Sequence, residues 1–418
     1  MMHPTPVAWF CWGLAILLPV IARADEESGR RPRAVPVDGE PFSARFAAFD
    51  QRGNLTFDDT GGRRPVAARD LVYWGDYRDA GARPQVVLAD GGLLVADVSG
   101  IRGESLAVYG DLCGQLPLPL ATVRGVILDP PLEPLRRDRL LDTIRSAPGA
   151  DDQVWLDNGD VIAGTLKRWP ETSETTPDHP SSLTLAVKGR DLEVPTDSVV
   201  AVLLNPLMAR PPKSVASALE VGFRDGSLWP IAKVTEAGAH TRLGLVCGAE
   251  FTLANDLLTS DVTWLRPRGQ RVTYLSDLPS VGYKHIPLLE LPWPLQRDRN
   301  VLGGQLRCGG RICTKGLGLH STSRVAYEVR EGDRRFQAEA ALDEHAGLRG
   351  SVTFRVLLED AQSQWQRAYE SPVVRGATGP LPISVDVRGA RRLALIVDFA
   401  TGGDVLDHAN WLNARFVR

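Results

Sequence analysis

A strand–turn–strand pattern that recurs at nearly constant spacing is the feature that most restricts how this chain can fold. Each copy joins two apolar strands through an Asp-Gly or Asn-Gly turn, and the turn aspartates Asp90, Asp157 and Asp225 lie 67 and 68 residues apart. These turn residues adopt positive φ at little cost, so each copy is expected to begin with a tight β-hairpin. A third strand, a second turn and a short closing strand follow. The second turn contains a glycine in every copy, at Gly114, Gly189 and Gly248.

A fourth, divergent copy precedes these three, with a turn at Asp38-Gly39 and a closing strand from Leu71 to Trp74. One copy of about 40 residues buries too little apolar surface to be stable alone. The copies must therefore pack against one another, or each must close into a small barrel. The order of turns and strands resembles that of Sm-like and SH3-like barrels.

Two segments between the copies have a different pattern. Leu135, Leu140 and Ile144 recur at helical spacing in the first, and the second joins the last two copies. We expect short linker helices that cover exposed strand edges. The predicted division is 1–24 signal peptide, 25–80 divergent β unit, 81–130 β unit, 131–150 helical linker, 151–206 β unit, 207–219 linker, 220–268 β unit and 270–418 C-terminal module.

Amino-acid composition and net charge restrict the fold class and the kinds of partner that this chain can have. The 418 residues include 40 glycines and 30 prolines, and long helical periodicity is scarce, which favours an all-β chain with many turns. The formal net charge of −3 gives no electrostatic footprint for nucleic acid or for an anionic membrane. We therefore expect no nucleic-acid partner.

The N-terminus is typical of a secretory signal peptide. Residues 7–21 are an apolar run, and Ala22 to Ala24 fits a signal-peptidase site. An uncleaved anchor is the alternative, but a run of fifteen residues that contains Pro19 is short for a membrane span. No later segment is apolar enough to cross a bilayer, so the mature chain is expected to have no membrane span. We expect export to the periplasm, the cell surface or the extracellular space.

Four cysteines remain after the predicted signal peptide, an even number that permits disulfides in an exported chain. Cys308 and Cys313 flank four residues predicted as a hairpin tip, where a bridge and two free thiols both remain open. Cys113 and Cys247 occupy equivalent places in two copies, where a bridge and two separate buried positions both remain open. No Cys/His cluster has zinc spacing.

The last third of the chain shows the clearest strand alternation. Apolar residues share one face in each of five segments: 325–329, 336–342, 352–356, 383–387 and 393–397. With two further segments near the ends of the module, this predicts seven to nine strands in a jelly-roll β-sandwich.

Several dense motifs in this module resemble the NPCBM module, the carbohydrate-binding module associated with glycoside hydrolase family 98. In chain order they are Tyr274-Leu-Ser-Asp277, Arg297-Asp-Arg299, Lys315-Gly-Leu-Gly-Leu-His-Ser321, Leu342-Asp-Glu344, Gly350-Ser-Val-x-Phe354-x-Val356 and Asp407-His-Ala-Asn-Trp411. The resemblance implies a galactose-binding-like jelly roll, carbohydrate binding and, in some members, a structural calcium ion. The chain departs from the family pattern at Leu319 and Asn410, where Thr and Asp are most frequent.

Five residues of these motifs are candidate carbohydrate ligands. Trp411 suits a stacking platform, and a core tryptophan is the alternative. His320 follows a Gly-rich segment from which a side chain can reach the rim, or it is a hydrogen-bonded structural histidine. Asp407, His408 and Asn410 could hold sugar hydroxyls or cap the final loop.

Asp343 and Glu344 are the candidate ligands for a calcium ion, because hard oxygen ligands suit that ion; a solvated turn is the alternative. No other cofactor is expected. The sequence contains no Gly-x-Ser-x-Gly, His-Glu-x-x-His or phosphate-loop motif, so we expect no enzyme. The sequence predicts an exported, non-catalytic protein that binds a glycan at the sandwich rim. The alternatives are a surface scaffold whose β units bind a protein partner, and an accessory subunit of a glycoside hydrolase.

Overall fold

The computed structural model describes residues 31–50, 54–171, 181–210, 218–269, 271–288, 291–376 and 378–418. The predicted signal peptide and most of the predicted linker 207–219 lie outside these ranges. Residues 207–210, a described part of that linker, are not helical.

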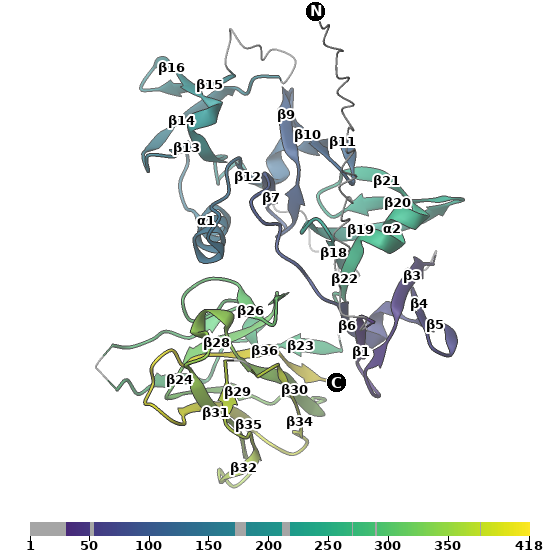
Figure 1. The fold of residues 1–418 in the computed structure, drawn as a ribbon, viewed down its shortest axis with the longest axis vertical. Helices are drawn as coiled ribbons and strands as arrows, with labels where there is room; N and C mark the ends of the chain where they lie inside the picture. Colours follow the sequence, from purple (N-terminus) through teal and green to yellow (C-terminus); the bar gives the residue numbers. More distant parts are fainter. Residues whose placement is uncertain are drawn as a thin grey trace, which may run out of the picture. The chain divides into compact units, whose positions relative to one another are not determined.

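The first part of the described chain consists of four β units (Figure 1). The first has β1 Arg33–Pro36, β2 Phe42–Ser43, β3 Arg45–Phe49, β4 Leu55–Asp59, β5 Gly62–Val66 and β6 Leu71–Gly75. The second has β7 Gln85–Leu88, β8 Leu93–Val95, β9 Asp97–Arg102, β10 Ser105–Gly110, β11 Gly114–Pro119 and β12 Val123–Ile127. The third has β13 Asp152–Leu156, β14 Val161–Arg168, β15 Ser182–Val187, β16 Arg190–Pro195 and β17 Val199–Leu203. The fourth has β18 Leu219–Phe223, β19 Leu228–Ala237, β20 His240–Leu245, β21 Glu250–Ala254 and β22 Val262–Pro267.

The closing strand of every unit returns to pair with the first strand of the same unit, as β6 does with β1 and β12 with β7. The hairpin turns form where the sequence predicts them, and Gly91, Gly159 and Gly226 adopt φ of +93°, +90° and +88° there. Only glycine reaches these values without steric cost.

The four β units are joined by strand pairing between units. Strand β12 also pairs with β17, β8 with β19, and β22 with β6, so that strands from all four units join one large antiparallel sheet. Buried apolar residues from all four units form one continuous cluster. This sharing supplies the core that a single unit is too small to build.

Helix α1, Pro134–Ser146, lies in the linker where helical spacing predicts it. The Glu133 carboxylate caps its first turn by accepting hydrogen bonds from the backbone N–H groups of Leu135 and Arg136. Leu141 and Ile144 pack against β7 and β12. The helix therefore covers an inner part of the sheet, and the expectation that it covers a strand edge is wrong. A second helix, α2 Asn255–Asp261, precedes β22 and was not predicted.

The C-terminal module is an antiparallel β-sandwich, which confirms the all-β class. Its strands are β23 Val272–Tyr274, β24 Gly282–His285, β25 Gln296–Arg297, β26 Leu306–Cys308, β27 Arg311–Cys313, β28 Gly316–His320, β29 Ser323–Glu328, β30 Arg335–Leu342, β31 Ser351–Glu359, β32 Trp365–Glu370, β33 Val374–Arg375, β34 Leu381–Asp386, β35 Arg392–Phe399 and β36 His408–Val417. Among described residues, two six-stranded sheets enclose one core. The prediction of seven to nine strands was too low, in part because β23, β25 and β33 have only two or three residues each and are too short to show alternation.

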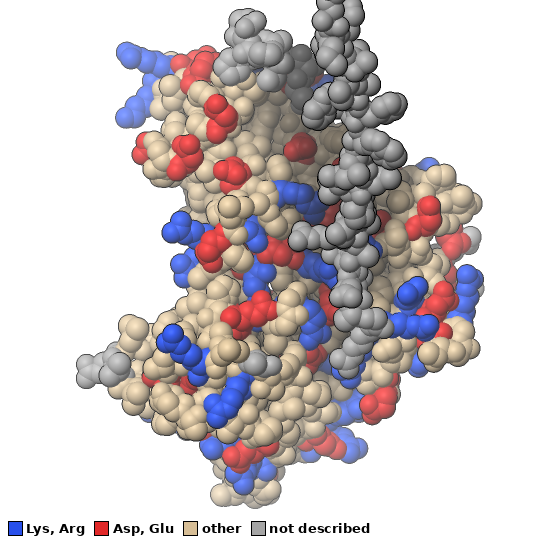
Figure 2. Space-filling model, in the orientation of Figure 1, with Lys and Arg blue, Asp and Glu red and all other residues tan. Residues whose placement is uncertain are grey.

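Charged side chains connect the β units to the sandwich. The Tyr73 hydroxyl donates to Glu339, and Arg311 pairs with Asp76 at 3.0 Å. The buried Asp138 of α1 pairs with the buried Arg307 of β26 at 2.8 Å. On the face drawn in Figure 2, basic and acidic side chains are interspersed.

All four cysteines in the described residues are free. Strands β26 and β27 form a hairpin whose turn is Gly309-Gly310, so the predicted four-residue tip is wrong. In that register Cys308 lies opposite Arg311, and Cys313 lies opposite Leu306. The structure therefore agrees with the free-thiol alternative, and burial raises the pKa of Cys308 to about 11.

Candidate functional site

The two densest motifs of the C-terminal module are neighbouring strands. Strand β28 pairs antiparallel with β36, and His320 lies opposite His408 while Leu317 lies opposite Trp411. Successive side chains of a strand point to opposite faces of the sheet. The pairing therefore places both histidines on one face and directs Leu317 and Trp411 into the core.

Trp411 is not a sugar-stacking residue, which corrects the first candidate. Its exposed fraction is 0%, and its indole packs edge-on against Phe354 with ring centroids 5.0 Å apart. Phe336 packs on it as well, at 6.1 Å. The alternative, a core tryptophan, is correct. Trp411 and Ala409 are two positions apart on β36, so both side chains point to the core face of the sheet.

Asn410 is also unavailable to a ligand. It is fully buried, and its side-chain amide donates to the Asp343 carboxylate at 2.7 Å. Asp343 accepts further hydrogen bonds from the Asn300 side chain, the Arg307 backbone and both the backbone and ring nitrogens of His345. That contact with Asp343 raises the pKa of His345. The assignment of Asn410 to sugar binding is therefore wrong, because the residue is part of a buried structural network.

The Asp407 carboxylate links two loops beneath the rim through hydrogen bonds within the protein. Its carboxylate accepts hydrogen bonds from the Ser321 hydroxyl at 2.6 Å and the Ser351 backbone N–H at 2.9 Å. Burial raises the pKa of Asp407, although both hydrogen bonds oppose that shift. Its exposed fraction is 1%, so its assignment to sugar hydroxyls is wrong as well.

His320 and His408 lie in a group of aromatic rings at the sandwich rim, here called the rim cluster: His285, Trp293, His320 and His408. The Trp293 indole stacks on the His320 imidazole with centroids 4.8 Å apart and an angle of 6° between the ring planes. His408 lies 5.8 Å from His320, and His285 meets His320 edge-on at 5.8 Å. Trp293 and His285 are partly exposed, while His320 and His408 are buried beneath them.

Hydrogen bonds fix where two of the imidazoles carry their protons. The Trp293 backbone N–H donates to Nδ1 of His285 at 3.1 Å, so Nε2 of that ring carries the proton and donates to the Ser321 carbonyl at 3.0 Å. Nδ1 of His320 donates to the same carbonyl at 2.9 Å. In the neutral ring, Nε2 of His320 is therefore an acceptor.

Both inner histidines are held in their neutral form. Burial lowers the pKa of His320, although the hydrogen bond to Ser321 and nearby aspartates oppose the shift. Burial, together with the neighbouring His320, lowers the pKa of His408 to about 4. Nδ1 of His408 is buried and has no hydrogen-bond partner in the structure. At neutral pH His320 and His408 are thus uncharged, and their ring nitrogens can accept hydrogen bonds.

Sequence reasoning missed Trp293 and gave His285 no role. Trp293 lies between Pro292 and Pro294, outside any alternating segment. A tryptophan in a segment without strand or helix periodicity has no apolar face that would place it in a core. The absence of periodicity around Trp293 could therefore have marked it as a candidate surface residue. Its stacking on His320 could not be read from the sequence, because the two residues lie on separate segments of the chain and meet only through the fold.

The described residues of the rim cluster carry groups that suit the binding of a ligand. A stacked indole offers an apolar face to a sugar ring, and imidazole nitrogens can accept hydrogen bonds from sugar hydroxyls. The hydroxyl of the adjacent Ser321 is fully buried and donates to Asp407, so it is not exposed as a nucleophile. The geometry therefore favours recognition of a neutral, hydroxyl-rich ligand.

Both candidate calcium ligands accept hydrogen bonds from protein groups. Asp343 is fully buried and its carboxylate is occupied by protein donors, whereas Glu344 accepts a hydrogen bond from the backbone of Gly310. In the part of the chain that the structure describes, no group of three or more His, Cys, Asp or Glu residues could hold a metal ion. The calcium site stays an untested prediction.

The match to a protein-family model concerns the C-terminal third of the chain. Residues 271–417 match the model of the NPCBM/NEW2 domain family, which confirms the resemblance seen in the motifs. NPCBM domains are carbohydrate-binding modules, so the match fits a carbohydrate-binding role. Over the described residues, no helix is both long and apolar enough to cross a membrane.

One curated relative and two solved structures illustrate what the chain is similar to. A Renibacterium salmoninarum protein named "Putative endo-alpha-N-acetylgalactosaminidase" is 32% identical over 152 residues, which are 35% of this chain and only 9% of that much longer protein. A Clostridium perfringens ZmpB structure, CBM51-2 with GlcNAc and INT domains, is 24% identical with a TM-score of 0.31, covering 45% of this chain and 40% of that one. The CBM51 of Clostridium perfringens GH95 with methyl-galactose is 22% identical with a TM-score of 0.31, covering 35% of this chain and 99% of that one.

Proposed function

We propose that this chain is an exported, non-catalytic protein that binds a carbohydrate at the rim cluster of its C-terminal sandwich. The stacked pair of Trp293 and His320 is the observation that carries the proposal. Trp293 is partly exposed, and buried neutral histidines support it from below. The match to a carbohydrate-binding family supports a carbohydrate-binding role for the sandwich.

A glycan array on the full chain and on a Trp293→Ala variant tests the proposal. Binding of any retained glycan should weaken at least tenfold, which corresponds to about 1.4 kcal/mol. Trp365→Ala is the matched control, because Trp365 is 42% exposed on β32, an edge strand of the other sheet. If Trp293→Ala retains glycans as the unchanged chain does, the rim cluster is not the site.

The non-catalytic assignment has its own test. The carboxylates of Asp343 and Asp407 are buried and hydrogen-bonded, so neither is available as the acid or base of glycoside cleavage. The full chain should release no product from any glycan that it retains on the array. Product release that survives in repeated, independently purified samples would contradict a purely binding role.

A role in protein binding is the second candidate, with the chain as a surface scaffold or as an accessory subunit of a glycoside hydrolase. Strand β16 lies at one end of the large sheet and most of its residues are exposed. An end strand offers unpaired backbone groups that another chain can pair with. Capture of an exported protein by the full chain, undiminished by Trp293→Ala, would favour this role.

A further inference from the structure

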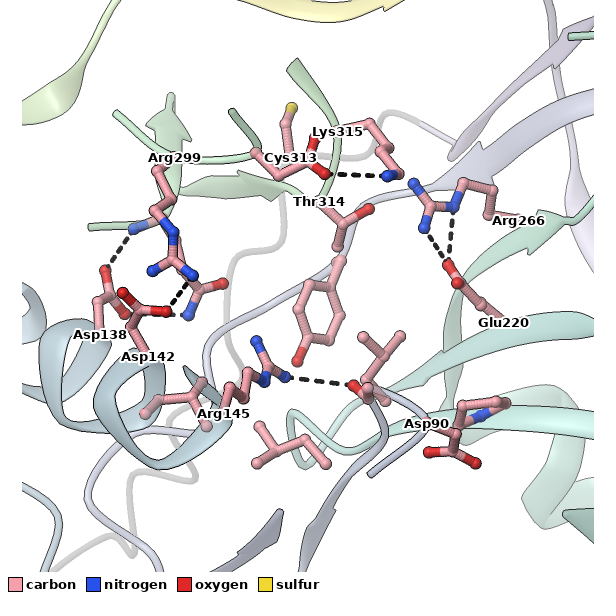
Figure 3. A pocket seen from close by; sticks show the side chains of 18 of the residues that line it. Asp90, Asp138, Asp142, Arg145, Glu220, Arg266, Arg299, Cys313, Thr314 and Lys315 are labelled. Atoms are coloured by element: carbon pink, nitrogen blue, oxygen red, sulfur yellow. Dashed lines mark hydrogen bonds and ion pairs between the residues drawn. The ribbon is translucent and has the colours of Figure 1, made fainter. Parts of the chain in front are cut away.

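The rim cluster differs from the other polar regions of the molecule in the kind of titratable group that it contains. The pocket drawn in Figure 3 includes ion pairs within the protein, such as that of Glu220 with Arg266. Three of the four rings of the rim cluster are instead histidines, the residue type whose charge ordinarily changes between pH 8 and pH 5. The response of the cluster to acid depends on how the fourth ring, that of Trp293, is held.

Two side chains of strand β24 hold the backbone of Trp293. The Tyr283 hydroxyl donates to the Trp293 carbonyl oxygen at 2.7 Å, and the Trp293 N–H donates to Nδ1 of His285 at 3.1 Å. Tyr283 and His285 are two positions apart, so they lie on one face of the strand. Strand β24 therefore fixes the position from which the Trp293 indole stacks on His320.

The bond to His285 has no substitute within its own segment. Residues 292–294 are Pro-Trp-Pro, and proline has no N–H, so Trp293 supplies the only backbone donor of this tripeptide. Burial raises the pKa of Tyr283 to about 12, so its hydroxyl keeps its proton between pH 5 and pH 8. The bond to His285 is therefore the one of the two that can respond to mild acid.

The hydrogen bonds of His285 require a neutral imidazole. Its Nε2 donates to the Ser321 carbonyl at 3.0 Å, and Nδ1 uses its lone pair to accept the Trp293 N–H. A proton on Nδ1 would make both ring nitrogens donors, and two N–H groups would then point at each other. The bond to Ser321 would become charge-assisted and keep the ring in place, so Trp293 is the partner that must move.

The surroundings of His285 permit this protonation. The charged and titratable groups on the described elements around it are Lys284 on its own strand, Arg324 on β29, His320 on β28, His408 on β36, and Asp404 and Asp407 between β35 and β36. Lys284 and Arg324 are opposite each other in the register and point to the other face of the sheet. Burial lowers the pKa of His320 and of His408, so both are uncharged at neutral pH. Of the groups listed, those that remain are neutral or acidic, and neither kind repels a proton on Nδ1.

We propose that His285 is an acid-sensitive positioning residue, which releases the Trp293 indole from its stack on His320 when Nδ1 takes up a proton. The stacked arrangement belongs to the neutral ring, so acid should favour the released one. Weaker glycan binding in acid follows from this, and only that consequence rests on the proposed function.

Fluorine NMR of the full chain labelled with fluorotryptophan tests the proposal without any glycan. The Trp293 signal is the one that Trp293→Phe removes, and the shift of a signal between H2O and D2O grows with the exposure of its ring. This solvent shift should be larger for Trp293 at pH 5 than at pH 8. Trp411, which is 0% exposed in the core, reports whether the sandwich stays folded and should show no solvent shift at either pH.

Variants separate the proton from the fold. His285→Asn keeps an acceptor near the place of Nδ1 and cannot be protonated, so the Trp293 solvent shift should stay small at both pH values. His285→Phe has no acceptor, so the shift should be large at both. Tyr283→Phe removes the other bond to Trp293 but leaves the imidazole, so the increase in acid should persist. His240→Asn, at an exposed histidine of β20, is the control and should behave like the unchanged chain.

Two results would overturn the proposal. One is a Trp293 solvent shift that is equal at pH 5 and pH 8 in the unchanged chain. The other is an increase in acid that His285→Asn retains, since another group would then be responsible. If the Trp411 signal shows that His285→Asn is unfolded, His285→Phe decides in the same way, because an increase in acid that persists in it overturns the proposal.

A glycan array at the same two pH values tests the consequence for binding. Retention by the unchanged chain should weaken in acid by up to about tenfold, the effect expected for loss of the Trp293 side chain, and retention by His285→Asn should not. An array on which no glycan is retained counts against the proposed function, while the NMR result still decides the role of His285.

Discussion

Replacing His408 by phenylalanine should make the sandwich more resistant to acid. His408 is 6% exposed, its pKa is lowered from 6.5 to about 4, and its Nδ1 has no hydrogen-bond partner. Phenylalanine keeps an aromatic ring at this place and removes the ring nitrogens, and with them the ability to take up a proton.

The size of the effect follows from proton linkage. Above pH 6.5 the ring is neutral in the folded and the unfolded chain, so it adds no pH dependence. As the pH falls from 6.5 towards 4, the unfolded chain binds the proton first and folding loses stability. At about 1.4 kcal/mol for each pH unit, the full loss is about 3 kcal/mol. The His408→Phe variant should be spared this loss.

Urea unfolding at pH 7.5 and pH 4.5, followed by circular dichroism and by tryptophan fluorescence, measures the difference. Other groups titrate in this range, so only the difference between the unchanged chain and the variant is interpreted. Because a chain of several units can unfold in steps, the free energy of unfolding is taken from the transition that the variant shifts. His240→Phe, at an exposed histidine of β20, is the control. Equal pH dependence in the unchanged chain and His408→Phe would refute the reasoning.

Three further predictions test the sandwich. Trp411→Phe should lower the free energy of unfolding by about 1–3 kcal/mol yet leave glycan affinity unchanged, since that side chain is in the core; an affinity loss on the array would contradict the corrected role. Gly318→Ala should cost about 3 kcal/mol in urea unfolding, because a Cβ there would clash with the Arg299 carbonyl oxygen; a variant as stable as the unchanged chain would show that this contact relaxes. Removing calcium with EGTA should leave the melting temperature unchanged, because protein donors already occupy Asp343; a clear drop would support the predicted calcium site.

The regular β architecture could be predicted from the sequence because local rules produce it. Asp-Gly and Asn-Gly turns set the hairpins, and alternating apolar residues such as Val352, Phe354 and Val356 set the core face of a strand. The helical spacing of residues 131–150 likewise predicted α1. The motifs also identified the family of the last third.

The binding roles of His320 and His408 stay predictions, and strand pairing shows only that the two residues lie on one face. His320 and His408 do lie together at the rim, but the more conspicuous Trp411, two positions from Ala409, faces the core with it. Choosing between the two faces of β36 needed the partner strand and the second sheet. The pairing of β28 with β36 supplies that information.

The sequence by itself therefore determined the β class, the repeated hairpins and the carbohydrate-binding family of the last third, because these depend on local turn chemistry and on period-two alternation. Only the tertiary structure decided which side chains form a surface. Trp293 and His320 meet through the fold of two separated segments. Contacts between distant segments depend on packing, and no local pattern records them.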